Sequence, residues 1–143
     1  MSERPLRVLF VCKENANRSQ MAEAFARIHG GTSVEAASAG SRPSGQVNFR
    51  AVASMAERGY DLGRHRSKSV DELSTGAWDC VVTMGCGDEC PHVVTPRRED
   101  WAIPDPRDLP PEAFARVRDE IERRVIDLLA RLQADGAAGT LRL

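Results

Sequence analysis

Three residues near the amino terminus carry side chains that work together in chemistry on oxyanions: Cys12, Arg18 and Ser19. A cysteine thiolate is a strong nucleophile, and an arginine guanidinium binds a tetrahedral oxyanion through paired hydrogen bonds. The Ser19 hydroxyl can donate a hydrogen bond to the sulfur and can also cap a helix. The alternative is a buried cysteine at the end of a strand, beside an unrelated surface arginine. The spacing favours a nucleophile held against a bound oxyanion.

The sequence around these residues predicts a strand, a loop and a helix. Residues 6–11 include a short apolar run typical of a buried parallel strand, and residues 19–29 repeat apolar side chains at helical spacing. The loop between them points backbone N–H groups at one spot, and the helix dipole adds to a field that favours the thiolate of Cys12. We therefore predict that the oxyanion is bound by Lys13, Glu14, Asn15, Ala16, Asn17 and Arg18.

The rest of the chain alternates predicted strands and helices. Further strands are predicted at residues 33–39, 78–84 and 101–103, and helices at 47–58, at 69–73 and from Pro111 onward. This alternation indicates a three-layer α/β fold, in which a four-stranded parallel sheet has helices on both faces. Ligands bind such a sheet at the carboxyl ends of its strands, so Cys12, the segment around Cys86 and Asp105 should share one edge.

Length and composition restrict the class of protein. The 143 residues predict one domain, residues 1–143, with residues 136–143 as a flexible tail. The net charge of −1, with acids and bases interspersed, argues against a nucleic-acid partner. No apolar run is long enough for a membrane span or a signal peptide, so we expect a cytoplasmic monomer. In that compartment, four cysteines indicate reactive thiols or a metal site rather than static disulfides.

The motif C-x5-R-S after the first strand resembles the phosphate-binding loop of the low-molecular-weight protein tyrosine phosphatase fold. That fold includes tyrosine phosphatases and arsenate reductases, and the continuation Arg18-Ser19-Gln20-Met21-Ala22-Glu23 is similar to the reductases. The resemblance implies that Cys12 attacks arsenate. It covers nearly the whole chain.

Asp105 is the candidate proton donor. It lies between Pro104 and Pro106, in a stiff loop before the last predicted helix. Displacing an oxygen from arsenate is helped by a proton donated to the leaving group. An aspartate in such a loop is often only a turn former. Asp105-Pro106, however, resembles the pair that carries the general acid in this family, and the motif favours Asp105 over Asp108.

Two further cysteines, Cys86 and Cys90, separate the candidate functions. A reductase must move two electrons onto arsenic and needs additional thiols, which a phosphatase does not. The resemblance implies that Cys86 attacks Cys12 and releases arsenite, and that Cys90 then attacks Cys86 to leave a disulfide for thioredoxin to reduce. There are two alternatives. Cys86, Cys90 and His92 could bind zinc, or the two cysteines could be unreactive loop residues. Cys80, inside an apolar run, is predicted to be a core residue.

The sequence also departs from the family pattern. The short Cys86–Cys90 spacing leaves open a small-thiol donor, either mycothiol with mycoredoxin or glutathione with glutaredoxin. Glu14 places a carboxylate beside the predicted anion site, so its side chain must point away or be paired. Asn15 matches a loop-bracing asparagine, and with Glu23 it matches residues that hold potassium in some reductases. Lys68 lies where its ammonium group could replace that ion. The rival functions are a phosphatase and a non-enzymatic oxyanion or thiol sensor.

Overall fold

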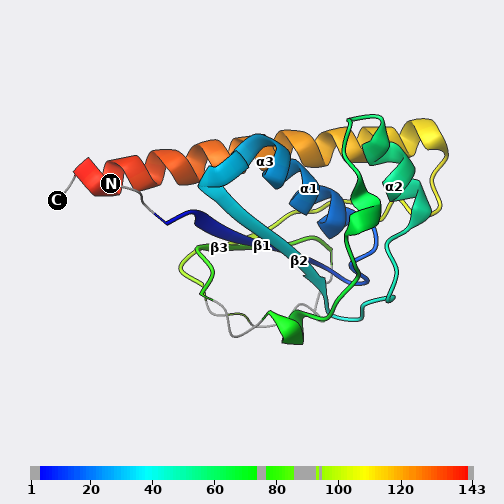
Figure 1. The fold of residues 1–143 in the computed structure, drawn as a ribbon, viewed down its shortest axis with the longest axis horizontal. Helices are drawn as coiled ribbons and strands as arrows, with labels where there is room; N and C mark the ends of the chain where they lie inside the picture. Colours follow the sequence, from blue (N-terminus) through cyan, green and yellow to red (C-terminus); the bar gives the residue numbers. More distant parts are fainter. Residues whose placement is uncertain (1–3, 74–76, 86–92, 94, 142–143) are drawn as a thin grey trace.

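The computed structural model describes residues 4–73, 77–85, 93 and 95–141, with side chains up to residue 135. Its centre is a four-stranded parallel sheet in the order β2-β1-β3-β4 (Figure 1). The strands are β1 (Leu6–Cys12), β2 (Val34–Gly40), β3 (Cys80–Thr83) and β4 (Arg98–Asp100). The predicted α/β fold with a four-stranded parallel sheet is confirmed. Because all strands run in one direction, their carboxyl ends form one edge of the molecule.

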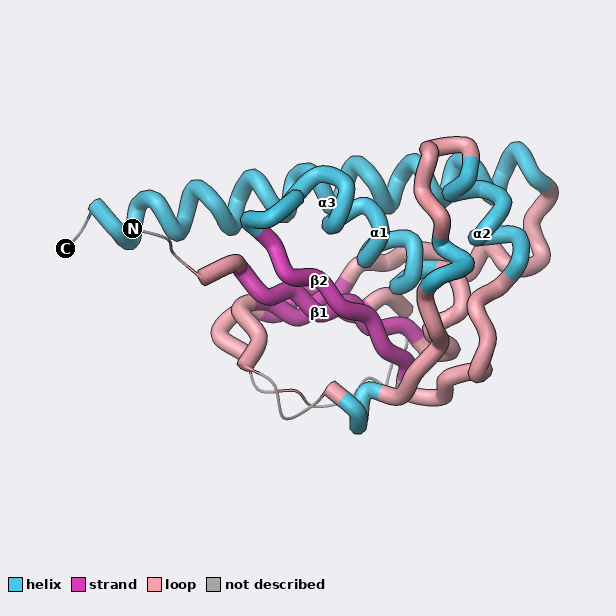
Figure 2. The backbone as a smooth tube through the Cα atoms, in the orientation of Figure 1, coloured by secondary structure: helices cyan, strands magenta, loops and turns pink. Residues whose placement is uncertain are grey.

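Helices and a short 3-10 segment cover the two faces of the sheet. The α-helices are α1 (Arg18–Gly30), α2 (Phe49–Ala56) and α3 (Pro111–Leu141), and all three lie on one side of the sheet (Figures 1 and 2). Alternate β1 residues such as Val8 and Phe10 pack against this helical layer, whereas Leu9 and Val11 join the core of the other face. That second core is closed, among the described residues, by the 3-10 helix η3 (Val70–Glu72) and its neighbours. Two further 3-10 helices are η1 (Gly31–Ser33) and η2 (Leu62–Arg64).

Register places the end of β1 beside the end of β2. Cys12 lies opposite Gly40 in the β1–β2 pair. A Cβ atom at Gly40 would lie 2.7 Å from the Lys13 carbonyl oxygen and 3.0 Å from the Asn15 nitrogen. Glycine at this position therefore lets the loop after Cys12 fold back across the neighbouring strand.

Most predicted boundaries differ from the structure by one or two residues, and three differences are informative. The fourth strand is Arg98–Asp100 and not residues 101–103, because an edge strand needs only backbone pairing, while Trp101 and Ile103 turn into the core after it. Helix α2 begins later than predicted because the Asn48 side chain accepts a hydrogen bond from Arg50 N and caps it. Helix α3 continues to Leu141, past the point where we expected the tail to begin. No helix in the described part of the chain has the length and apolar character needed to span a membrane.

Candidate functional site

The loop between β1 and α1 is held from outside through its carbonyl groups. The carbonyl oxygens of residues 12–16 accept hydrogen bonds from Ser41 N, Arg42 N, Ser44 N, Gln20 Nε2 and Asn48 N. Because each peptide group is planar and trans, an outward carbonyl turns the next N–H the opposite way. The amides of residues 13–17 are therefore directed toward the inside of the loop, where the amino terminus of α1 adds partial positive charge. Such an arrangement of amides is what the predicted anion cradle requires.

Cys12 lies at the start of this cradle and is 2% exposed. Its sulfur lies 2.9 Å from Ser19 Oγ. Ser19 Oγ also accepts a hydrogen bond of 2.8 Å from Asn15 Nδ2. An amide nitrogen can only donate, so the hydroxyl hydrogen of Ser19 is free to point at the Cys12 sulfur. The geometry provides a donor that stabilises a thiolate.

Asn15 gives the loop its shape. It has φ of 53°, the one positive value among non-glycine residues in the described part of the chain. Asparagine tolerates this left-handed conformation better than most residues. Its Oδ1 accepts hydrogen bonds from Gln20 Nε2 at 2.8 Å and from Lys68 N at 3.0 Å. The predicted bracing role of Asn15 thus has a partner, Gln20, that the sequence did not indicate as a site residue.

Arg18 closes the cradle. Its Nη1 donates to the Ile103 carbonyl at 3.1 Å, and its Nη2 lies 3.9 Å from Asp105 Oδ2. Gly85, with φ of 81°, lies directly against the guanidinium, and any Cβ there would collide with Arg18 Nη1. The guanidinium therefore lies between Gly85, two residues after β3, and the segment that carries Ile103 and Asp105.

Asp105 faces the same cleft. Its Oδ1 accepts a hydrogen bond from Arg107 N at 3.0 Å, which orients the carboxyl group. The residues that line the cleft are Cys12, Glu14, Ala16, Asn17, Arg18, Asp105 and Arg107. Of the two aspartates considered from the sequence, Asp105 and Asp108, it is Asp105 that belongs to this lining.

Glu14 is paired, as a carboxylate beside an anion site must be. Its Oε2 accepts a hydrogen bond from Arg107 Nη1 at 2.7 Å. This contact connects the anion loop to the segment of Asp105 and offsets the negative charge of Glu14. Nothing in the sequence indicated Arg107, because the two residues are 93 positions apart.

Similarity to known proteins agrees with this geometry. Residues 7–138 match the low molecular weight phosphotyrosine protein phosphatase family. The chain belongs to this family. A glutaredoxin arsenate reductase of Synechocystis sp. is 36% identical over 129 residues, covering 88% of this chain and 98% of the relative.

Two solved structures of arsenate reductases are similar to this protein. One, in the phosphate binding state, has a TM-score of 0.82 and 36% identity and covers 88% of this chain and 98% of its own. The other, a thioredoxin-dependent enzyme of Corynebacterium glutamicum, has a TM-score of 0.77 and 31% identity and covers 94% of this chain and 65% of its own.

Of the three remaining cysteines, only Cys80 lies among the described residues. Cys86 and Cys90, together with His92, lie outside the described residues, so their predicted relay and the zinc alternative stay predictions. Cys80 is fully buried in β3, in the core, as predicted. Burial raises the pKa of its thiol to about 12, so it is not a second nucleophile at neutral pH.

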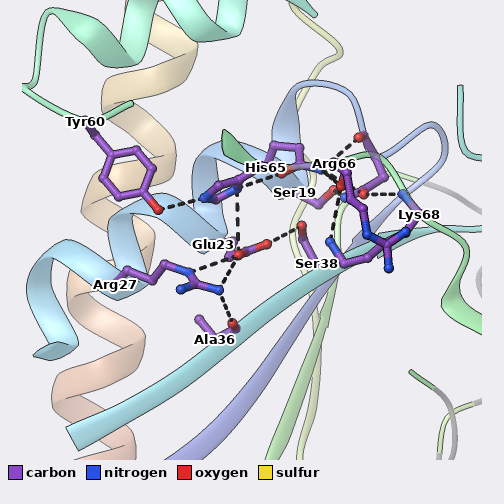
Figure 3. A network of polar contacts seen from close by, with 11 residues as sticks. Ser19, Glu23, Arg27, Ala36, Ser38, Tyr60, His65, Arg66 and Lys68 are labelled. Atoms are coloured by element: carbon purple, nitrogen blue, oxygen red, sulfur yellow. Dashed lines mark hydrogen bonds and ion pairs between the residues drawn. The ribbon is translucent and has the colours of Figure 1, made fainter. Parts of the chain in front are cut away.

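Asn15 and Glu23, for which the resemblance implies potassium binding, have oxygens that protein groups already engage. Glu23 Oε1 accepts a hydrogen bond of 2.6 Å from Ser38 Oγ (Figure 3), and Asn15 Oδ1 accepts from both Gln20 and Lys68. These oxygens already have protein donors. Burial lowers the pKa of the half-buried Lys68, and the charge of Glu23 opposes that shift. No step proposed below is therefore routed through a potassium ion.

Proposed function

We propose that this protein reduces arsenate to arsenite, with Cys12 as the nucleophile. The observation that carries the proposal is the Ser19 hydroxyl, 2.9 Å from the Cys12 sulfur and oriented by Asn15, inside a loop closed by Arg18. Arsenate is a tetrahedral oxyanion and matches a cradle of inward amides and a guanidinium.

In the first step Cys12 forms a bond to arsenic. The thiolate sulfur attacks the arsenic atom of bound arsenate, and one arsenic–oxygen bond breaks. The departing hydroxyl takes a proton from Asp105 and leaves as water. Arg18 and the loop amides stabilise the negative charge on the remaining oxygens. The product is an arsenic(V) adduct of Cys12.

In the second step two electrons move to arsenic. The thiolate of Cys86 attacks the sulfur of Cys12, and a disulfide forms as the sulfur–arsenic bond breaks. The electron pair of that bond stays on arsenic, which leaves as arsenite. Cys90 then attacks Cys86 and frees Cys12 as a thiolate. A dithiol donor reduces the Cys86–Cys90 disulfide and is itself oxidised.

Two observations favour a reductase over a phosphatase. The relatives reported above are named arsenate reductases. The cleft, as far as the structure describes its lining, presents no aromatic ring against which a phosphotyrosine could stack. The loop binds phosphate-like anions in general, so slow hydrolysis of an aryl phosphate is compatible with the proposal.

The donor we propose is thioredoxin, acting on a monomer in the cytoplasm, where thiol donors are kept reduced. A thioredoxin-dependent enzyme is among the similar structures, and a glutaredoxin-named enzyme is among the relatives. Glutaredoxin with glutathione, or mycoredoxin with mycothiol, is the second candidate.

Arsenite production by the purified protein tests the function. The protein receives arsenate and, in turn, thioredoxin with its reductase and NADPH, glutaredoxin with glutathione, or mycoredoxin with mycothiol. We expect turnover with thioredoxin, its loss in Cys86→Ser and Cys90→Ser, and its retention in the buried control Cys80→Ala. Turnover only with a small thiol would keep the reductase and remove the relay. Failure with every donor, together with efficient aryl phosphate hydrolysis, would identify a phosphatase.

A further inference from the structure

Hydrogen-bond directions around Cys12 can be assigned outward from groups whose role is fixed. Lys68 N is a backbone amide and can only donate, so the Asn15 atom it contacts at 3.0 Å is the side-chain oxygen. The other terminal atom of Asn15 is then the nitrogen, which donates to Ser19 Oγ at 2.8 Å. Ser19 is left to donate to the Cys12 sulfur. The inner part of the network therefore runs in one direction, toward Cys12.

The next residue outward, Gln20, is fixed by the same reasoning. Its Nε2 lies 2.9 Å from the Arg66 carbonyl and 3.1 Å from the Asn15 carbonyl, and carbonyl oxygens only accept. The nitrogen has two hydrogens, so one points at the Arg66 carbonyl and the other is shared between the Asn15 carbonyl and Asn15 Oδ1, which lies at 2.8 Å. Gln20 Oε1 must then be the atom that faces His65. Gln20 is fully buried, so each of these contacts replaces water that it cannot reach.

His65 and Tyr60 form the outer end. His65 Nδ1 lies 2.9 Å from Gln20 Oε1, so it must carry a hydrogen and donate it. In the neutral ring Nε2 is then an acceptor, and Tyr60 Oη, at 2.7 Å, donates to it. Tyr60 and His65 point toward each other in Figure 3, with Ser19 on the far side of the imidazole.

We propose that Gln20, His65 and Tyr60 are positioning residues for Cys12. They are the outer half of a chain of donors that runs Tyr60–His65–Gln20–Asn15–Ser19 and ends on the Cys12 sulfur. Each donor in such a chain polarises the next, so the Ser19 hydroxyl is a better donor to a thiolate than an isolated serine would be. The chain also fixes the left-handed Asn15 and thus the curvature of the anion loop.

The inner links do not depend on the charge of His65. Nδ1 donates in both the neutral and the protonated ring, and protonation changes only the link to Tyr60. Burial lowers the pKa of His65, and the nearby carboxylate of Glu23, 3.7 Å from Nδ1, opposes that shift. The other charged groups that act on the ring are Arg27, Arg64 and Lys68. The neutral ring is therefore the form present above neutral pH.

The test measures ionisation of Cys12 directly. It takes from the proposed function only that Cys12 acts as a thiolate, and it needs no arsenate. The rate of iodoacetamide alkylation at Cys12 is followed against pH in the reduced protein, with each thiol resolved by peptide mass spectrometry. Its midpoint reports the pH at which half of the Cys12 thiol is ionised. Failure to produce arsenite would thus leave this measurement unaffected.

We expect Gln20→Met and His65→Phe to move the midpoint upward by about 0.5–1 pH unit, because a donor chain that stabilises the thiolate is broken. His65→Asn, which can place a donor near the Nδ1 position, should restore most of the wild-type midpoint. Tyr60→Phe should give a smaller upward shift. The matched control is His29→Phe, because His29, near the carboxyl end of α1, pairs with Glu122 of α3 and its substitution should leave the midpoint unchanged.

Thermal melting identifies variants that do not fold. If Gln20→Met fails to fold, the midpoints of His65→Phe and His65→Asn test the proposal. If both of these variants fail to fold, the midpoint of Tyr60→Phe tests it. A merely structural role would lower the melting temperature and leave the midpoint in place. Wild-type midpoints in the folded variants, or a shift of equal size in His29→Phe, would overturn the proposal.

Discussion

Cys12 and Cys80 are two buried cysteines on neighbouring strands, and their surroundings differ. Cys80 lies level with Val8 in the β1–β3 pair, inside the core, and burial raises the pKa of its thiol to about 12. Cys12 lies four residues further along β1, at the end of the strand, where the Ser19 hydroxyl can donate a hydrogen bond to its sulfur. Burial by itself makes a thiol inert. A buried thiol becomes a nucleophile where hydrogen-bond donors and positive charge replace the water it has lost.

Removing each sulfur is the strongest way to test this contrast. Cys12→Ser should lower arsenite production by at least about a thousandfold, because serine at this position is a far weaker nucleophile. Cys80→Ala should keep its activity and lose about 1 kcal/mol of unfolding free energy through a small cavity. Donor-coupled turnover and urea unfolding measure the two effects. Comparable activity losses in both variants would contradict the contrast.

The proton donor is the next largest contribution. Asp105→Asn keeps an acceptor for Arg107 N but has no proton to give, so kcat should fall by about 10²–10³-fold. Asp108→Asn is the matched control, three positions away, and should retain kcat. Steady-state kinetics with saturating arsenate measures both variants. Full activity in Asp105→Asn would remove the general acid from the proposed mechanism.

The donor to Cys12 should have a smaller effect. Ser19→Ala removes the hydroxyl that faces the sulfur and leaves Asn15 Nδ2 without this partner, so turnover should fall by about tenfold. Ser44→Ala is the control, because its hydroxyl lies in an exposed turn and, within the described part of the chain, hydrogen-bonds to Gln46 alone. Turnover at several pH values measures the effect. A loss that stays the same at every pH would indicate that Ser19 acts on loop shape rather than on the thiolate.

Burial of Cys80 should make the unfolding free energy depend on pH in the alkaline range. The pKa of Cys80 is about 12 in the folded protein and 9.0 without burial, so deprotonation favours the unfolded chain. Its contribution to stability is complete below pH 9 and is lost as pH rises toward 12. The unfolding free energy of the wild type should therefore decrease relative to that of Cys80→Ala above about pH 9. Urea unfolding of both proteins across this range measures the difference, and parallel curves would contradict it.

Potassium should have the smallest effect. The oxygens of Glu23 and Asn15 that would hold the ion are engaged by protein donors in this chain. Replacing potassium by sodium at constant ionic strength should leave turnover and melting temperature unchanged. A strong dependence on potassium would show that the donors around Glu23 rearrange to admit the ion.

The parts of the site that the sequence predicted are those with short sequence separation. Cys12, Arg18 and Ser19 lie within eight residues, and a strand followed by a helix leaves the loop between them little freedom. Their grouping in the structure agrees with the prediction. Asp105 was predicted through its resemblance to a family motif and its place after a strand. The position of the fourth strand was predicted wrongly, because buried apolar residues at 101 and 103 resemble a strand more than the charged edge residues that pair.

The sequence by itself therefore determined the fold class, the anion loop and the inert character of Cys80. Only the tertiary structure decided that Arg107 neutralises Glu14 and that His65, 45 positions from Gln20, completes the donors behind Cys12. The physical reason is that apolar periodicity and loop chemistry depend on residues close together in the sequence. The partner of a buried polar group, in contrast, is the group that chain packing places within about 3 Å of it, however distant in sequence.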